Sequence, residues 1–266
     1  MSVENAIQDK AYYERFMVAT AHQKAGRLQE ARDIYRALLD ENPDNANALH
    51  LLGMLCHQAG NTEMGISFIQ KAIELNPDFP LFLNNLGHIQ LSIDQLDSAE
   101  TTLLRATQLD TDMLASLYGL AECYRRKGKF QKAANFVEYV LERDPQHVDA
   151  LVCLGQIHMQ NSSAKKALEL FEMVLSINPD HIYARFHAAR THYALAQYDK
   201  SIAILQSLLQ QHPDYVACYN NLGNAYMAKH QYKDAKTAYQ NAIRLNPRDA
   251  NMQYNLAVAI SALKYS

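Results

Sequence analysis

The sequence lacks the features that would place it in a membrane or in a secreted class of proteins. No stretch approaches the ~18 consecutive apolar residues that a membrane-spanning helix needs. The first ten residues mix Glu4, Asp9 and Lys10 with small residues, so they do not form the basic and apolar regions of a signal peptide. We therefore expect a soluble, cytoplasmic protein without a membrane span.

Cysteine is scarce and scattered. The four cysteines, Cys56, Cys123, Cys153 and Cys218, form no Cys-x-x-Cys pair. This spacing fits neither a disulfide framework nor a zinc site, and we expect each thiol to be buried as a small hydrophobic group. The histidines form no pair four residues apart and have no carboxylate among them, so we expect no metal site.

The sequence also has no large excess of charge of one sign and no catalytic motif. Twenty-five basic and 28 acidic side chains leave a net charge of -3, which gives no attraction for a phosphate backbone and makes nucleic acid an unexpected partner. No glycine-rich phosphate loop, nucleophile elbow or paired metal-binding helix motif is present. We expect no catalytic residue, no cofactor and no enzymatic activity.

What the sequence does contain is a regular spacing of its prolines. Six of its seven prolines, Pro43, Pro77, Pro145, Pro179, Pro213 and Pro247, are separated by 34, 68, 34, 34 and 34 residues, and Thr111 stands at the skipped place. Proline marks a break between helices because it lacks an N–H and disfavours helix in the preceding residue. With this proline as position 32, seven units span 12–45, 46–79, 80–113, 114–147, 148–181, 182–215 and 216–249. Residues 1–11 are then an N-terminal extension, and 250–266 form a C-terminal helix that is either a cap or the start of an eighth unit.

Two positions of each unit hold only small side chains. Position 8 is Ala19, Gly53, Gly87, Ala121, Gly155, Ala189 and Gly223, and position 20 is Ala31, Gly65, Ala99, Ala133, Ala167, Ser201 and Ala235. Such columns indicate two helices that approach closely. Position 15 holds Gly26, Gly60 and Gly128, which predicts a left-handed residue at the end of the first helix. Each unit is therefore predicted to be helix, turn, helix.

The pattern resembles the tetratricopeptide repeat family, which has small residues at 8 and 20, a large apolar residue at 24 and proline at 32. The seventh unit carries it most fully, in Tyr219, Leu222, Gly223, Tyr226, Ala235, Tyr239, Ala242 and Pro247. The resemblance implies an all-α fold, a right-handed superhelical solenoid of seven repeats plus a C-terminal helix. It also implies a protein-protein interaction module that holds a protein or an extended peptide in its concave groove.

Positions 2, 5, 9 and 12 of the first helix share one face, and the resemblance implies that this face lines the groove. We call these the groove positions. In the sixth repeat they are Tyr183, Phe186, Arg190 and Tyr193, a combination favoured at interaction hot spots, although such side chains also simply cover helix surface. In the fourth repeat they include Tyr118 and Arg125.

Asparagine supplies the second group of candidate binding residues. Asn84, Asn85, Asn220, Asn221 and Asn224 carry amides that can pair with a peptide main chain, although asparagine is also acceptable on any solvated surface. Asn85, Asn221 and Asn255 at position 6 resemble the asparagine ladder in the repeat arms of O-linked N-acetylglucosamine transferases, including the bacterial SPINDLY-type relatives. Position 5 holds no lysine or arginine, so the carboxylate clamp of chaperone-binding members is not expected.

The end of the chain has apolar residues on several faces. Met252, Tyr254, Val258 and Leu263 predict burial in a homodimer, against a partner or within a longer protein. The second repeat, with Leu49, Leu51, Leu52 and Gly53, is similar to repeats that precede glycosyltransferase or sulfotransferase domains. The alternative function is therefore the substrate-recruiting arm of such an enzyme, with its catalytic domain outside this chain.

Overall fold

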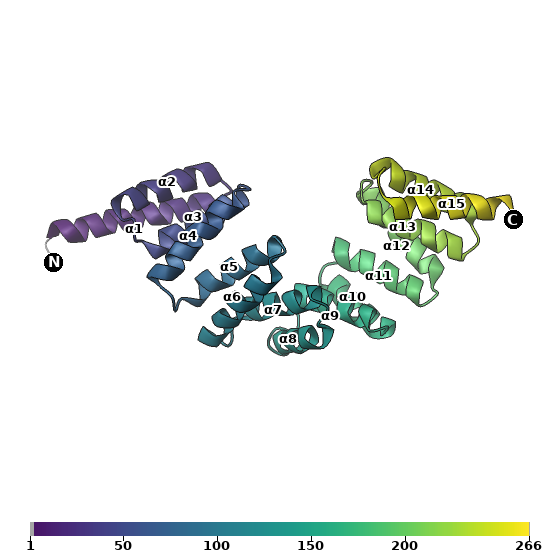
Figure 1. Cartoon of the computed structure of the whole chain (residues 1–266), viewed down its shortest axis with the longest axis horizontal. Coiled ribbons are helices and arrows are strands. Elements are labelled where there is room, and N and C mark those ends of the chain that lie inside the picture. The colour runs from purple at the N-terminus through teal and green to yellow at the C-terminus, as the bar shows by residue number, and fades with distance from the viewer. Residues whose placement is uncertain (1–2, 266) are drawn as a thin grey trace. The chain divides into compact units, whose positions relative to one another are not determined.

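The fold is all-α, as the sequence predicted. The computed structural model describes residues 3–265, with side chains from residue 11 onward. This described part consists of helices and connecting turns, without a strand. The helices form pairs, and neighbouring pairs lie side by side within each part of the chain (Figure 1).

The helix bounds follow the predicted period. The first helices of the pairs are α1 (Val3–Lys24), α3 (Ala46–Gln58), α5 (Pro80–Ser92), α7 (Leu114–Arg126), α9 (Val148–Gln160), α11 (Ile182–Ala194) and α13 (Val216–Ala228). The second helices are α2 (Leu28–Glu41), α4 (Thr62–Leu75), α6 (Leu96–Leu109), α8 (Phe130–Arg143), α10 (Ala164–Ile177), α12 (Tyr198–Gln211) and α14 (Tyr232–Leu245). The last described helix, α15 (Ala250–Lys264), packs on α14.

The turn inside every pair contains one residue with left-handed backbone. The residues with φ between +57° and +85° are Gly26, Gly60, Asp94, Gly128, Ser162, Ala196 and His230, and all of them stand at position 15. In the second pair the Asn61 backbone N–H donates to the Cys56 carbonyl at 2.8 Å, and the Gly60 backbone N–H donates to the His57 carbonyl at 2.9 Å. These are the two bonds of a Schellman motif, which requires the left-handed residue whatever its side chain.

Positions 8 and 20, which hold small side chains, lie where the two helices of a pair meet. In the second pair both columns are glycine, and a Cβ placed on Gly65 would stand 2.6 Å from the Gly53 carbonyl oxygen. In the third pair a Cβ on Gly87 would stand 2.5 Å from the Leu103 side chain. The second pair therefore brings backbone against backbone, whereas the third seats a large side chain over its glycine.

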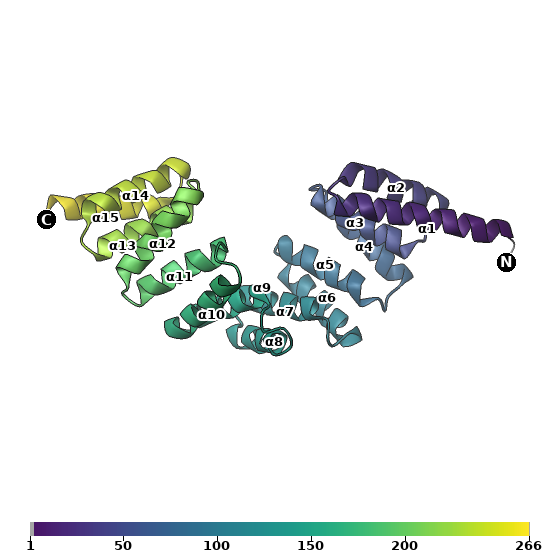
Figure 2. The same cartoon turned by 180° about the vertical axis from the view of Figure 1, so that it is seen from behind.

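The chain forms two compact units, Met1–Phe136 and Val137–Ser266. Tyr35 and Phe82 are among the largest fully buried side chains of the first unit, and Phe171 is among those of the second. No change of composition in the sequence indicated this division. Figure 2 shows the same helices from behind, with α1 to α7 in the first unit and α9 to α15 in the second.

The ends of the chain differ from the interior pairs. α1 begins at Val3, so the segment assigned to an N-terminal extension continues the first repeat's helix from that residue onward. Val18 stands at position 7, where the other pairs bury leucine or alanine, but it is 48% exposed. Within residues 3–265, no helix combines the length and apolar character that crossing a bilayer requires.

Candidate functional site

The groove positions of α11 carry the most exposed aromatic surface of the predicted site. Tyr183 is 63% exposed and Tyr193 is 39% exposed, with its ring 5.5 Å from that of Tyr198. Arg190 is exposed, and its guanidinium carbon lies 5.9 Å from the centre of the Phe186 ring. The helix places Tyr183, Phe186 and Arg190 on one face because they are three and four residues apart.

Phe186 differs from its three neighbours because it is buried. Its side chain is 8% exposed and belongs to the core of the second unit, with its ring 5.1 Å from that of Tyr215. Burial raises the pKa of Tyr215 to about 12. The structure therefore gives Phe186 a packing role beneath Arg190, in place of the exposed contact predicted from the sequence.

The predicted asparagines of the second unit are half-buried and already hydrogen-bonded. The Asn255 amide donates to Asn220 Oδ1 at 3.1 Å, and the Asn221 amide donates to the Ala217 carbonyl at 2.8 Å. The Tyr239 hydroxyl donates to Asn224 Oδ1 at 2.7 Å. Each side-chain amide thus already makes one hydrogen bond within the fold, which reduces what it can offer a peptide main chain.

Asn84 and Asn85 belong to a polar chain that crosses three helices of the first unit. The Ser116 hydroxyl donates to Asn84 Oδ1 at 2.9 Å, and the Asn84 amide donates to Asn85 Oδ1 at 3.0 Å. The Asn85 amide nitrogen lies 2.8 Å from His50 Nε2.

This series of hydrogen bonds ends at the neutral imidazole of His50. His50 is 4% exposed and its ring is stacked 4.7 Å from that of Phe82. Burial lowers the pKa of His50 to about 4, so Nε2 is free to accept the amide proton. Every donor in the series points toward this acceptor. Asn84, at 6% exposure and with both ends of its amide engaged, connects repeats instead of facing a ligand.

Arg125 is ion-paired within α7. Its guanidinium donates to both oxygens of Glu122 at 2.7 Å, and Arg126 donates to the same carboxylate at 2.7 Å. Burial alone would raise the pKa of Glu122, but the two arginines lower it below its usual value. Tyr118 lies one helical turn before Glu122 and is half-buried, so the fourth repeat presents less exposed aromatic surface than the sixth.

The first unit has a pocket that the sequence did not single out. It has a volume of about 290 Å³ and is lined by Tyr12, Tyr13, Phe16, Asn45 and Asn47. Tyr13, Phe16 and Asn47 stand at groove positions, so their aromatic and amide character was the signal that could have found it. Three aromatic rings with two amides beside them suit an apolar side chain of a ligand.

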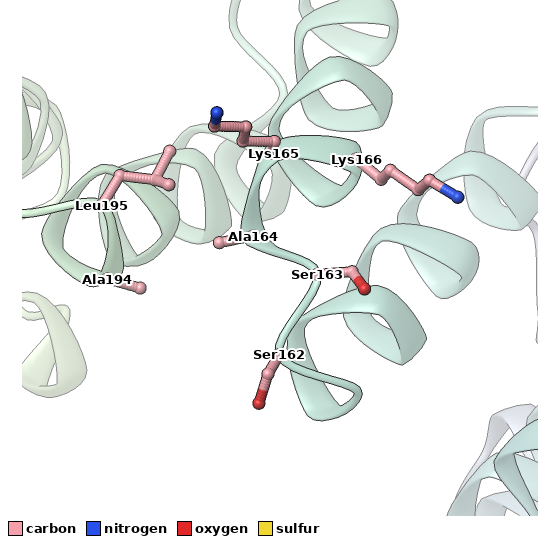
Figure 3. A pocket seen from close by; sticks show the side chains of 7 residues that line it. All are labelled: Ser162, Ser163, Ala164, Lys165, Lys166, Ala194 and Leu195. Atoms are coloured by element: carbon pink, nitrogen blue, oxygen red, sulfur yellow. The ribbon is translucent and has the colours of Figure 1, made fainter.

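A second pocket lies away from the groove positions, at the turn between α9 and α10. It has a volume of about 470 Å³ and is lined by Ser162, Ser163, Ala164, Lys165, Lys166, Ala194 and Leu195. Figure 3 shows the ammonium groups of Lys165 and Lys166 pointing in different directions, so they do not converge on one anion. Among the side chains that the structure describes, no group of three histidine, cysteine or acidic residues is placed to hold a metal ion.

Models of the tetratricopeptide repeat match most of the chain. They cover residues 16–80, 68–101, 118–182, 158–222 and 216–249, the last being the span of the seventh predicted repeat. The chain belongs to the tetratricopeptide repeat family. All four cysteines of this tetratricopeptide repeat protein are buried, as expected from their spacing.

Solved structures show the same fold at low sequence identity. A tetratricopeptide repeat protein from Parabacteroides merdae has a TM-score of 0.72 and 14% identity, over 94% of this chain and 99% of that one. A chain of the APC/C hetero-tetramer Cut9-Hcn1 has a TM-score of 0.81 and 15% identity, over 91% of this chain and 48% of that one. YrrB, described as a tetratricopeptide repeat protein with an unusual peptide-binding site, has a TM-score of 0.56 and 22% identity, over 74% of this chain and 97% of that one.

A curated relative matches a shorter part of the chain. The uncharacterized protein ycf37 of Pyropia yezoensis is 34% identical over 74 residues, which are 28% of this chain and 40% of that protein. The alignment thus spans less than half of the relative's length. Together these comparisons establish the repeat family and its fold.

Proposed function

We propose that this protein is a binding scaffold that holds a polypeptide segment of a partner against its groove positions, and that it does not itself catalyse a reaction. The observation that carries the proposal is the exposed aromatic surface on the first helices of the second unit. Tyr183 and Tyr254 are 63% and 70% exposed, and both stand at groove positions. Exposed aromatic side chains at the groove positions of α11 and α15 favour a binding surface.

The fold supports a binding role in a second way. Stacked helix pairs leave one face of each first helix free of its own second helix, so a repeated surface is available to an extended ligand. YrrB, which shares this fold, is described as having a peptide-binding site.

Site-specific photo-crosslinking tests the proposal. A photoreactive phenylalanine analogue at Tyr183 is compared with the same analogue at Met173, which is 46% exposed on the second helix α10. We expect a distinct partner protein crosslinked in cell extract through position 183 and not through position 173. Equal crosslinking at the two positions, or none at either, would contradict binding at the groove positions.

The enzyme-arm alternative has no specific support in the structure. It was inferred from the similarity of the second repeat and from the apolar end of the chain. The asparagine ladder of such arms is not supported either, because the side-chain amides of Asn85 and Asn255 are engaged with His50 and Asn220 of the neighbouring repeats. A recruiting arm would use the same face, so the crosslinking experiment would detect its substrate as well.

A homodimer through α15 is part of the proposal. Tyr254 is 70% exposed and Val258 is 39% exposed on this helix, so α15 presents apolar surface to a second copy. Light scattering after size-exclusion chromatography is the test, with Tyr254→Asp/Val258→Asp as the variant. A parent that stays monomeric at every concentration refutes the dimer. The four buried thiols fit a reducing compartment such as the cytoplasm, which cell fractionation checks.

A further inference from the structure

Arg190, on the first helix α11, has no acidic partner among the described side chains. Arg185, on the same helix, is 14% exposed and donates to Gln211 at 2.6 Å and to Ser207 at 2.8 Å, with Asp180 at 4.0 Å. Arg190 is exposed and has no carboxylate within ion-pair distance among the side chains of residues 11–265. Its charge is therefore available to a ligand.

The surroundings of Arg190 leave that charge uncompensated. The groove positions of α9, α11, α13 and α15 contain one acidic residue, Asp149, near the start of α9. Apart from Arg190 itself, the other residues at these groove positions are neutral. An isolated positive charge on a neutral, aromatic surface attracts an anionic group of a partner.

Neighbouring rings define what else the ligand must carry. The Phe186 ring lies beneath the guanidinium with 5.9 Å between the guanidinium carbon and the ring centre. Tyr183 and Tyr193, on the same helix, present exposed rings. The guanidinium offers paired N–H donors that match a planar carboxylate, and the tyrosines offer apolar contact area.

We propose that Arg190 binds the side-chain carboxylate of an aspartate or glutamate that stands beside an aromatic or aliphatic residue in the partner segment. This inference rests on the proposed function, because it names the ligand of the same face. A carboxylate fits better than a phosphate dianion, since the groove positions of the second unit supply one positive charge.

Selection of random displayed peptides on the full chain tests the inference. The peptides are presented without a free C-terminus, so a terminal carboxylate cannot be selected. We expect the enriched peptides to share an acidic residue next to an aromatic or aliphatic one. Enriched peptides that lack an acidic residue would overturn this inference and leave the proposed function standing, whereas the absence of any enrichment would overturn both.

Binding of a selected, C-terminally amidated peptide is then measured by fluorescence anisotropy. Arg190→Met keeps the side-chain stem, and we expect it to weaken binding by about tenfold to a hundredfold, the effect of losing a charge-assisted hydrogen bond. Arg244→Met, at an exposed site on α14, is the matched control and should bind like the parent. Replacing the peptide's acidic residue by its amide should add little to Arg190→Met, because both changes remove one interaction. Parent-like binding by Arg190→Met would overturn the inference.

Discussion

The left-handed residue at position 15 allows a test in which one chemical change has opposite effects at two nearby sites. Ala196 has φ of 57° in the turn between α11 and α12, whereas Ala194 is the last residue of α11. A left-handed alanine costs about 1–2 kcal/mol, and glycine removes that cost. Glycine also adds about 0.4–1 kcal/mol of conformational freedom to the unfolded chain. We therefore expect Ala196→Gly to stabilise the protein by about 0.5–1 kcal/mol.

The control change, Ala194→Gly, should instead destabilise by up to about 1 kcal/mol, because it places glycine in a helix. Gly60→Ala is the reverse change at the same repeat position, so it should destabilise the protein by a similar amount. A Cβ on Gly60 would meet nothing within 4 Å, so its φ of 85° is the source of the cost.

Urea unfolding followed by circular dichroism gives the overall change in stability. Repeat arrays can lose two-state behaviour, so native-state hydrogen exchange of the α12 amides provides a local measure. The reasoning is refuted if Ala196→Gly and Ala194→Gly shift stability in the same direction, or if Gly60→Ala is neutral.

Three further changes test the packing and the polar chain. Ser201→Ala should stabilise by about 1 kcal/mol in urea unfolding, because the buried Ser201 hydroxyl has no hydrogen-bond partner; a loss of stability would contradict this. Gly65→Ala should destabilise by about 1–3 kcal/mol, since its Cβ would lie 2.6 Å from the Gly53 backbone oxygen; an unchanged melting curve would count against close backbone packing. Because burial lowers the pKa of His50 to about 4, the unfolded chain takes up a proton first as pH falls below about 6.5, and stability declines. About 2 kcal/mol should be lost between pH 7 and pH 5, and His50→Gln should remove this contribution; an equal decline in both proteins would refute it.

The sequence was sufficient to predict the helix pairs because their period is fixed by local chemistry. Proline breaks and small residues at the helix contact depend on steric rules that operate within one repeat. The left-handed turns at Asp94, Ser162, Ala196 and His230 were not signalled by glycine, yet the same bonds at the helix end require them.

The burial of position 5 could not be predicted in the same way. Its environment depends on how one repeat is rotated against the next, which the face of a single helix does not specify. Asn85 at position 6 bonds to His50 at position 5 of the preceding repeat, and Asn255 bonds to Asn220 in the same manner. Residues assigned to the groove from helical geometry alone therefore include some that connect neighbouring repeats.

The side chain at position 5 is engaged differently from repeat to repeat. In the first unit His50 is hydrogen-bonded within the fold, whereas Phe16 at the same position lines the aromatic pocket. In α11 the equivalent residue is Phe186, which needs no hydrogen bond and packs into the core while supporting Arg190. The guanidinium of Arg190 itself lies on the exposed surface of α11. The two units should accordingly prefer different parts of a partner, an apolar side chain in the first and an acidic residue beside an apolar one in the second.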